Sequence, residues 1–173
     1  MSDTQDKQSL GIAVMVVSDT RTEQTDKSGK LLAERLQAAG HRLQEKRIVP
    51  DDIYRIRATV SAWCIDPEVD VIIATGGTGL TGRDGTPEAV EVLYDKAIEG
   101  FGEIFRAISF EEIGTSSLQS RASAGVTNGR FIFCLPGSAS ACATGWDRLI
   151  SAQLDSTTRP CNLAELRPRL KEC

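Results

Sequence analysis

A cluster of glycines is the first feature of this sequence whose residue types suggest chemistry. The segment Thr75-Gly76-Gly77-Thr78-Gly79 alternates glycines with hydroxyl side chains. Closely spaced glycines expose backbone N–H groups, which can surround a phosphate without obstruction by side chains. The two threonine hydroxyls and the nearby guanidinium of Arg83 add donors that suit an anion. The segment therefore predicts a phosphate-binding loop, and a surface turn without a ligand is the weaker alternative.

Two common glycine motifs do not account for this loop. Gly77, Gly79 and Gly82 match G-x-G-x-x-G, but a dinucleotide-binding motif opens a helix at once, whereas Thr86-Pro87 here marks a later helix start. Gly77 and Gly82 also have P-loop spacing, yet Arg83-Asp84 stands where Lys and Ser or Thr belong. A nicotinamide-dependent oxidoreductase is therefore an improbable alternative, and a different kind of phosphate loop is expected.

Two aspartates are candidates for binding a cation beside that phosphate. Asp51 and Asp84 each follow an expected strand, so the fold can bring both carboxylates to one edge of a sheet. Mg²⁺ binds through carboxylate and phosphate oxygens, and phosphoryl transfer depends mainly on positioning and charge neutralisation. We therefore predict that Asp51 and Asp84 are catalytic residues and metal ligands. The alternative for Asp51 is a helix N-cap after Pro50, unless Asp52 takes that role.

Other polar residues follow apolar segments in the same way. Ser18-Asp19 and Pro136-Gly137-Ser138 are expected at the ligand-binding edge, although both also suit ordinary caps and turns. His41 is the only histidine, which removes most Ser-His, Cys-His and His-rich zinc schemes. We expect His41 to be a solvated turn residue, and both tryptophans, Trp63 and Trp146, to be core or subunit-contact residues rather than platforms for a pterin ring.

An alternation of strands and helices must position these residues. Apolar, β-branched runs predict buried strands over 11–17 and 69–75, with a weaker strand over 42–49. A tight turn at Asn128-Gly129 is expected to lead into a further strand over 130–135. Helices are expected after a cap at Asp26 or Ser28, from Ile53 to Trp63, from Thr86, over 101–112 and 142–153, with a short one over 118–124. The pattern predicts a three-layer α/β/α sandwich with a mostly parallel, mixed sheet.

Composition limits the class of protein. The 173 residues suffice for one core, so we expect a flexible start over 1–9, one domain over 10–155 and a tail over 156–173 that packs on this domain or on a neighbouring subunit. The net charge of −4 without a basic stripe argues against nucleic-acid binding. A polar N-terminus, the lack of any apolar run near about 18 residues, and five cysteines without metal-site spacing lead us to expect a cytoplasmic protein with reduced thiols and no membrane contact.

The motifs, taken together, resemble those of one family. Thr75–Gly79, Arg83-Asp84 and Thr86-Pro87-Glu88-Ala89 look like the signature of the MoaB/MogA molybdopterin-binding proteins. The resemblance extends to Val14–Asp19, Val49–Asp51, Ser120-Arg121 with Gly125, and Leu135–Ser138, and the gephyrin N-terminal domain is similar. The segments Phe101–Arg106, Ser109–Thr115 and Thr158–Asn162 resemble the MoaB branch in particular.

The resemblance implies a molybdopterin-binding fold, trimers that pair into hexamers, and Mg-ATP-dependent adenylylation of molybdopterin with release of pyrophosphate. It places Asp51 and Asp84 at the acidic positions with Mg²⁺, and Gly76, Gly77, Thr78 and Gly79 around phosphate. It also places Ser18, Asp19, Ser120 and Ser138 in the remaining pocket. Other proteins of the cofactor pathway are expected partners. A non-catalytic molybdopterin-binding or carrier protein remains the alternative.

Overall fold

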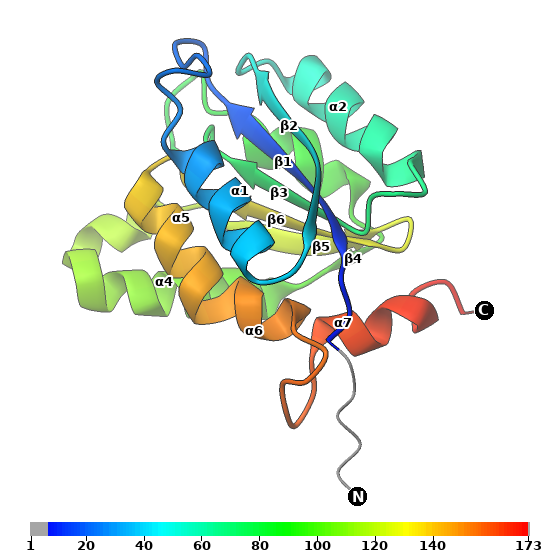
Figure 1. Ribbon diagram of the computed structural model, residues 1–173. Helices are drawn as coiled ribbons and strands as arrows, with labels where there is room; N and C mark the ends of the chain where they lie inside the picture. The colour runs from blue at the N-terminus through cyan, green and yellow to red at the C-terminus, as the bar shows by residue number, and fades with distance from the viewer. Residues whose placement is uncertain (1–6, 173) are drawn as a thin grey trace, which may run out of the picture.

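One six-stranded sheet organises the chain (Figure 1). The structure is a computed structural model that describes residues 7–172. The strands are β1 (Gly11–Val17), β2 (Arg42–Val49), β3 (Val71–Thr75), β4 (Lys96–Ala97), β5 (Ser123–Thr127) and β6 (Arg130–Leu135), in the order β2-β1-β3-β6-β5-β4. Strands β2, β1, β3 and β6 are parallel to one another, whereas β5 is antiparallel to both of its neighbours, β6 and β4. The mostly parallel, mixed sheet predicted from the sequence is therefore confirmed.

Helices cover both faces of this sheet. They are α1 (Ser28–Ala38), α2 (Ile53–Ile65), α3 (Thr86–Val90), α4 (Glu99–Ile113), α5 (Ala139–Gly145), α6 (Ser151–Leu154) and α7 (Leu163–Leu166). Short 3₁₀ segments are η1 (Glu91–Leu93), η2 (Gly114–Gln119) and η4 (Arg167–Arg169), and a π-helical turn, η3 (Trp146–Ile150), joins α5 to α6. No helix within residues 7–172 is both long and apolar enough to cross a bilayer.

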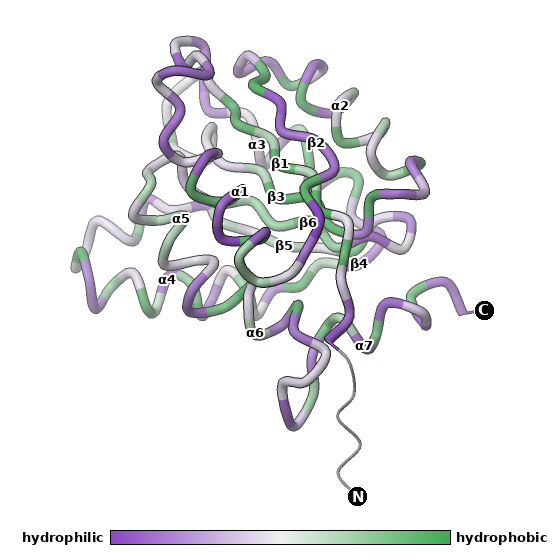
Figure 2. The backbone as a smooth tube through the Cα atoms, viewed as in Figure 1, coloured by the Kyte–Doolittle hydropathy of each residue, from purple (hydrophilic) through white to green (hydrophobic). Residues whose placement is uncertain are grey.

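The three layers follow from side-chain alternation along the strands. Ile12 and Val14 of β1 belong to the core shared with α1, α4 and α5, whereas Ala13 and Met15 belong to the core shared with α2 and α3. Figure 2 shows the central strands in the hydrophobic colour and the peripheral loops mostly in the hydrophilic colour. The tryptophans on α2 and η3 are buried, as expected. The α/β/α sandwich is therefore confirmed.

The region between α4 and β6 differs from the sequence-based expectation. A short helix was predicted over 118–124, but η2 ends at Gln119, and Ser123 and Ala124 already belong to β5. Asn128 (φ 47°) and Gly129 (φ 75°) form the predicted tight turn, so β5 pairs with β6 as a hairpin. Pairing with a neighbouring strand thus overrides the local helical pattern of this segment.

The two ends of the chain can be compared with the predicted flexible start and the predicted tail. Residues 1–6 of the predicted flexible start, and Cys173 at the end of the predicted tail, lie outside the described residues. Within the described part of the tail, Ala164 of α7 is fully buried in the core of the α1 face. Arg167 also pairs with Asp70 at 2.8 Å. The tail therefore contacts the same domain.

His41 is buried, and the expectation of a solvated turn residue was wrong. Its Nδ1 atom accepts the backbone N–H of Leu10 at 3.2 Å, and its ring meets the edge of Trp146 at 6.3 Å between centroids. Burial, together with nearby Lys7 and Arg42, lowers the pKa of His41, and Asp155 opposes this shift. Contacts with Leu10, which precedes β1, and with Trp146 of η3 decide its environment, and local sequence does not reveal them.

Candidate functional site

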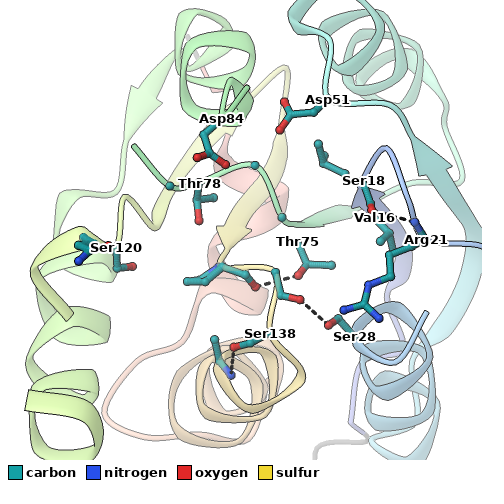
Figure 3. Close-up of a pocket in the computed structure, with 18 of the residues that line it drawn as sticks. Val16, Ser18, Arg21, Ser28, Asp51, Thr75, Thr78, Asp84, Ser120 and Ser138 are labelled. Atoms are coloured by element: carbon teal, nitrogen blue, oxygen red, sulfur yellow. Dashed lines mark hydrogen bonds between the residues drawn. The ribbon is translucent and has the colours of Figure 1, made fainter. Parts of the chain in front are cut away.

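A cavity of ≈ 530 Å³ opens at the carboxyl ends of β1, β3 and β6 (Figure 3). Open parallel sheets offer ligands a crevice at this edge, where successive strands lead into loops. Most of the residues predicted for the site line it: Ser18, Asp51, Thr75, Gly76, Gly77, Thr78, Gly79, Asp84, Ser120, Pro136, Gly137 and Ser138. Two predicted residues, Asp19 and Arg83, do not line the cavity.

The glycine-rich loop passes close over the end of β1. Gly76 (φ 99°) and Gly77 (φ 65°) adopt left-handed backbone conformations, which residues with a side chain rarely take. A Cβ atom on Gly76 would lie 2.3 Å from the carbonyl oxygen of Val17. Glycine at Gly76 is therefore required both by the backbone conformation and by the close approach of β1.

Thr86 closes this loop at its base. Its backbone N–H donates to the carbonyl of Gly77 at 3.0 Å, and its buried hydroxyl donates to the carbonyl of Gly76 at 2.8 Å. At the other side, the Thr75 hydroxyl donates to the carbonyl of Pro136 at 2.9 Å, which ties the ends of β3 and β6 together. The backbone of the loop is thus fixed before any ligand binds.

Asp51 is free for a role other than capping. Asp52 caps α2 by accepting the backbone N–H of Arg55 at 2.9 Å, so the alternative in which Asp52 is the cap holds. The Asp51 carboxylate accepts the N–H of Gly85 at 3.3 Å. Burial raises the pKa of Asp51, the like charges of Asp84 and Asp19 add to this, and the Gly85 N–H partly offsets it.

Asp84 has a different environment. One oxygen of its carboxylate accepts both the hydroxyl and the backbone N–H of Thr81, at 2.7 and 2.8 Å. The hydroxyl of Thr81 is the main cause of a lowered pKa for Asp84; burial opposes the shift, and backbone N–H groups and Arg121 add to it. Asp84 is therefore held as a carboxylate by its own loop.

Asp51 and Asp84 lie at the same end of the cavity, on separate segments of the chain (Figure 3). A Cβ atom on Gly77 would lie 3.1 Å from an oxygen of Asp51, and one on Gly79 would lie 2.6 Å from an oxygen of Asp84. Side chains at these glycines would fill the space between the two carboxylates. The absence of side chains keeps both acids accessible from the cavity.

The two carboxylates fit an open magnesium site better than a closed metal cage. Within residues 7–172, no group of three or more His, Cys, Asp or Glu side chains is arranged to hold an ion. Mg²⁺ typically keeps several waters and binds through one or two carboxylates together with substrate phosphates. Asp51 and Asp84 beside a loop rich in backbone N–H groups are a donor set of this kind.

Asp19 and Arg83 brace the rim of the site. Asp19 accepts the backbone N–H of Asp51 at 3.0 Å, and its other oxygen pairs with Arg83 at 3.3 Å. The Arg83 side chain is 80% exposed, so the guanidinium that the sequence placed beside phosphate lies at the surface. Both residues connect the β2–α2 junction to the glycine-rich loop.

Several residues that were not predicted as site residues line the cavity, and Arg121, also not predicted, bonds to the loop beside the cavity. Arg21 lines it, and so does Ser28, whose hydroxyl donates to the carbonyl of Gly137 at 2.7 Å. Arg121 donates to the carbonyls of Gly79 at 2.9 Å and Asp84 at 3.2 Å, and pairs with Glu88. Arg121 belongs to the Ser120-Arg121 segment that resembles the family, although no role was predicted for it, whereas nothing in the sequence distinguished Arg21 from other basic residues.

Ser120 and Ser138 lie on the two sides of the cavity formed by the later part of the chain (Figure 3). Ser138 caps α5 by accepting the backbone N–H of Ala141 at 3.1 Å, so its hydroxyl proton remains able to donate. The Ser120 hydroxyl accepts the N–H of Ala122 at 3.4 Å. Both serines thus combine a structural bond with a hydroxyl at the cavity.

Comparison with known proteins identifies the family. A family profile described as "Probable molybdopterin binding domain" matches residues 13–156. Molybdenum cofactor biosynthesis protein B of Escherichia coli (strain K12) is 53% identical over 161 residues, which are 93% of each chain. The crystal structure of a molybdenum cofactor biosynthesis protein B superposes with a TM-score of 0.83 at 45% identity, covering 85% of this chain and 92% of that one.

A second solved structure extends the comparison. The tungsten cofactor synthesizing protein MoaB from Pyrococcus furiosus superposes with a TM-score of 0.74 at 38% identity, covering 82% of this chain and 91% of that chain. The family profile itself spans the glycine-rich loop, both aspartates and the sheet from residue 13 onward. The chain belongs to the MoaB/MogA family of molybdopterin-binding proteins.

Proposed function

We propose that this protein acts in molybdenum cofactor biosynthesis as a molybdopterin adenylyltransferase, which joins molybdopterin to AMP from ATP and releases pyrophosphate. Membership of the family supports the pathway and the pterin ligand. One observation carries the catalytic part of the proposal: Asp51 and Asp84, from separate elements, flank a glycine strip at the edge of a cavity of ≈ 530 Å³.

The residues of the site match the needs of this reaction. A phosphate oxygen of molybdopterin attacks the α-phosphorus of ATP, a new P–O bond forms, and the bond to the bridging oxygen of pyrophosphate breaks. The attacking oxygen is already anionic, so no general base is required, which agrees with a cavity that lacks histidine among its lining residues within 7–172. Catalysis then rests on positioning and charge neutralisation.

The protein groups divide this work. The backbone N–H groups of Gly77 and Thr78 hold phosphate oxygens, whereas the N–H of Gly76 already donates to the carbonyl of Leu135. The hydroxyls of Thr78 and Ser138 orient the phosphate. Asp51 and Asp84 would hold Mg²⁺, which when bound neutralises charge between the two phosphates that react. Thr81 keeps Asp84 ionised, and Asp19 fixes the backbone at Asp51.

The test is pyrophosphate release from ATP by purified protein supplied with molybdopterin and Mg²⁺. We expect Asp84→Asn and Asp51→Asn each to lower the rate at least about 100-fold, because one group that neutralises developing charge is removed. Molybdopterin binding should remain nearly intact, since the isosteric amide does not empty the cavity.

Asp52→Asn is the matched control. It removes a carboxylate next to Asp51 but keeps a good N-cap for α2, so turnover should stay within about twofold of the wild type. No pyrophosphate from the wild type, despite measurable molybdopterin binding, would instead identify a carrier protein. Unchanged turnover in Asp84→Asn would remove that residue from the mechanism.

We further propose that the protein assembles into trimers or hexamers in the cytoplasm. Large apolar side chains that are more than half exposed gather on α4 and η2, which is more than scattered surface residues explain; they are Ile104, Phe110, Ile113 and Leu118. An exposed free thiol at Cys161 is compatible with a reducing compartment. Sedimentation equilibrium tests the assembly, and a monomeric mass would refute it.

A further inference from the structure

Arg21 is the only Lys, Arg or His among the described residues that line the cavity. Figure 3 shows its guanidinium extending toward the side of Ser28, away from Asp51 and Asp84. The cavity thus has a pair of carboxylates at one end and a single cation toward the other. A substrate with several phosphate groups would match both ends.

The charge of Arg21 is not cancelled by its acidic neighbour in the same loop, Asp26. One oxygen of Asp26 accepts the N–H of Gly29 at 2.8 Å, and the other accepts the ammonium of Lys46 at 2.9 Å. The ion pairs formed within residues 7–172 do not include Arg21. Its positive charge is therefore available to a ligand.

The loop that carries Arg21 is held by hydrogen bonds and a buried ion pair. The backbone N–H of Arg21 donates to the hydroxyl of Ser18 at 3.0 Å, and one guanidinium nitrogen donates to the carbonyl of Thr25 at 3.1 Å. The carboxylate of Asp26 is 1% exposed in its pair with Lys46 on β2, which anchors the end of the loop. These bonds reduce the freedom that Arg21 would lose on binding.

The serine next to this site does not compete with Arg21 for the ligand. Ser28 already donates its hydroxyl proton to the carbonyl of Gly137, so it positions the loop against β6 and has no proton left for an anion. Recognition therefore depends on the guanidinium, whose remaining N–H groups donate to no acceptor within the described chain. A planar guanidinium is well suited to a phosphate.

We propose that Arg21 forms a second anion subsite of the cavity, which binds a phosphate group that is not held between Asp51 and Asp84. The inference rests on the proposed function, since it assigns part of the same substrates. The phosphate belongs either to the terminal phosphates of the nucleotide, which leave as pyrophosphate, or to the pterin. Arg21 is thus a residue that determines substrate affinity, separate from the carboxylates that hold the metal.

The first test needs neither metal nor turnover. Isothermal titration calorimetry in EDTA measures the affinity for inorganic pyrophosphate and for inorganic phosphate. Arg21→Gln should weaken the binding of at least one of these probes about tenfold, because a charge-assisted contact is lost. Lys27→Gln, which removes a positive charge from the same loop outside the cavity, should leave both affinities unchanged within about twofold.

Steady-state kinetics then separates the two sources of phosphate. If the nucleotide is the ligand, Arg21→Gln raises KM for ATP and leaves KM for molybdopterin unchanged; if the pterin is the ligand, the reverse holds. Equal affinities of wild type and Arg21→Gln for both probes would overturn the subsite, as would an equal loss in Lys27→Gln. Because the calorimetry is free of metal and turnover, its result stands even if adenylylation fails.

Discussion

The two walls of the cavity are held in place by different kinds of interaction. The acidic wall is the segment Gly76–Thr86 with Asp51, and the basic wall is the segment Ser18–Ser28 with Arg21. Within the acidic wall, Thr86 and Thr81 bond to residues of the same loop, and positive-φ glycines set its path. The basic wall is instead anchored by Lys46, which comes from β2 at the edge of the sheet.

The pair between Asp26 and Lys46 shows how the basic wall is stabilised. Burial alone would lower the pKa of Lys46, but hydrogen bonds and the charges of Glu23 and Asp26 outweigh it and raise the pKa. Lys46 therefore remains charged although its side chain is only 14% exposed. The comparison teaches that bonds within the loop shape most of the wall that carries Asp84, with Arg121 as an added donor, whereas a long-range ion pair anchors the wall that carries Arg21.

The largest effect is expected in the acidic wall, at Gly76. Gly76→Ala should reduce the free energy of unfolding by about 3–5 kcal/mol, because the positive φ is strained and the new Cβ meets the carbonyl of Val17. Gly82→Ala is the control, since a Cβ there meets no atom within 4 Å. Urea denaturation measures both, and equal stabilities would show that the loop does not need its glycine conformation.

The basic wall should respond to loss of its buried carboxylate. Asp26→Asn should cost about 2–3 kcal/mol, because Lys46 loses its buried ionic partner. Glu23→Gln removes the other carboxylate on the same lysine, but Glu23 is 62% exposed, so the change should stay below about 0.5 kcal/mol. Similar losses in both variants would mean that burial does not distinguish the two pairs.

Arg121 lies outside the acidic wall but donates to two of its carbonyls, so its substitution measures how far this wall depends on a distant residue. Arg121→Gln should lower the rate of pyrophosphate release about tenfold, because the carbonyls of Gly79 and Asp84 lose a shared donor. Amide exchange of residues 79–84 should also accelerate, which reports on the loop without turnover. Arg106→Gln, which removes a donor to Ala122 instead, should change neither measurement.

The smallest effect concerns a position outside both walls. The neutral form of His41 is favoured in the fold, so its contribution is complete above the ordinary pKa of 6.5 and is lost as pH falls below it toward the lowered value. Protonation removes the acceptor for the Leu10 N–H, at a cost of about 1 kcal/mol. In His41→Gln, unfolding free energies at pH 7 and pH 5 should differ less than in wild type.

Much of the site was predictable because its signals are local. Buried β-branched runs specified β1 and β3, and the Asn128-Gly129 turn indicated β6. The parallel order of these strands placed their following residues at one edge. The closely spaced glycines located the loop in the sequence. Asp52 was recognisable as the alternative N-cap of α2, which leaves Asp51 free for another role. The predicted short helix over 118–124 failed because strand pairing with β6 decides the conformation of Ser123 and Ala124.

The sequence by itself determined the layered fold, the place of the glycine-rich loop and the two candidate acids, because periodicity, glycine spacing and residue chemistry are properties of short segments. Only the tertiary structure decided where each arginine near the cavity lies. Arg83 lies at the rim, Arg21 lines the cavity and Arg121 holds the loop, although all three are equally basic in sequence. The physical reason is that a side chain's partners come from segments distant in the chain, as Lys46 does for Asp26.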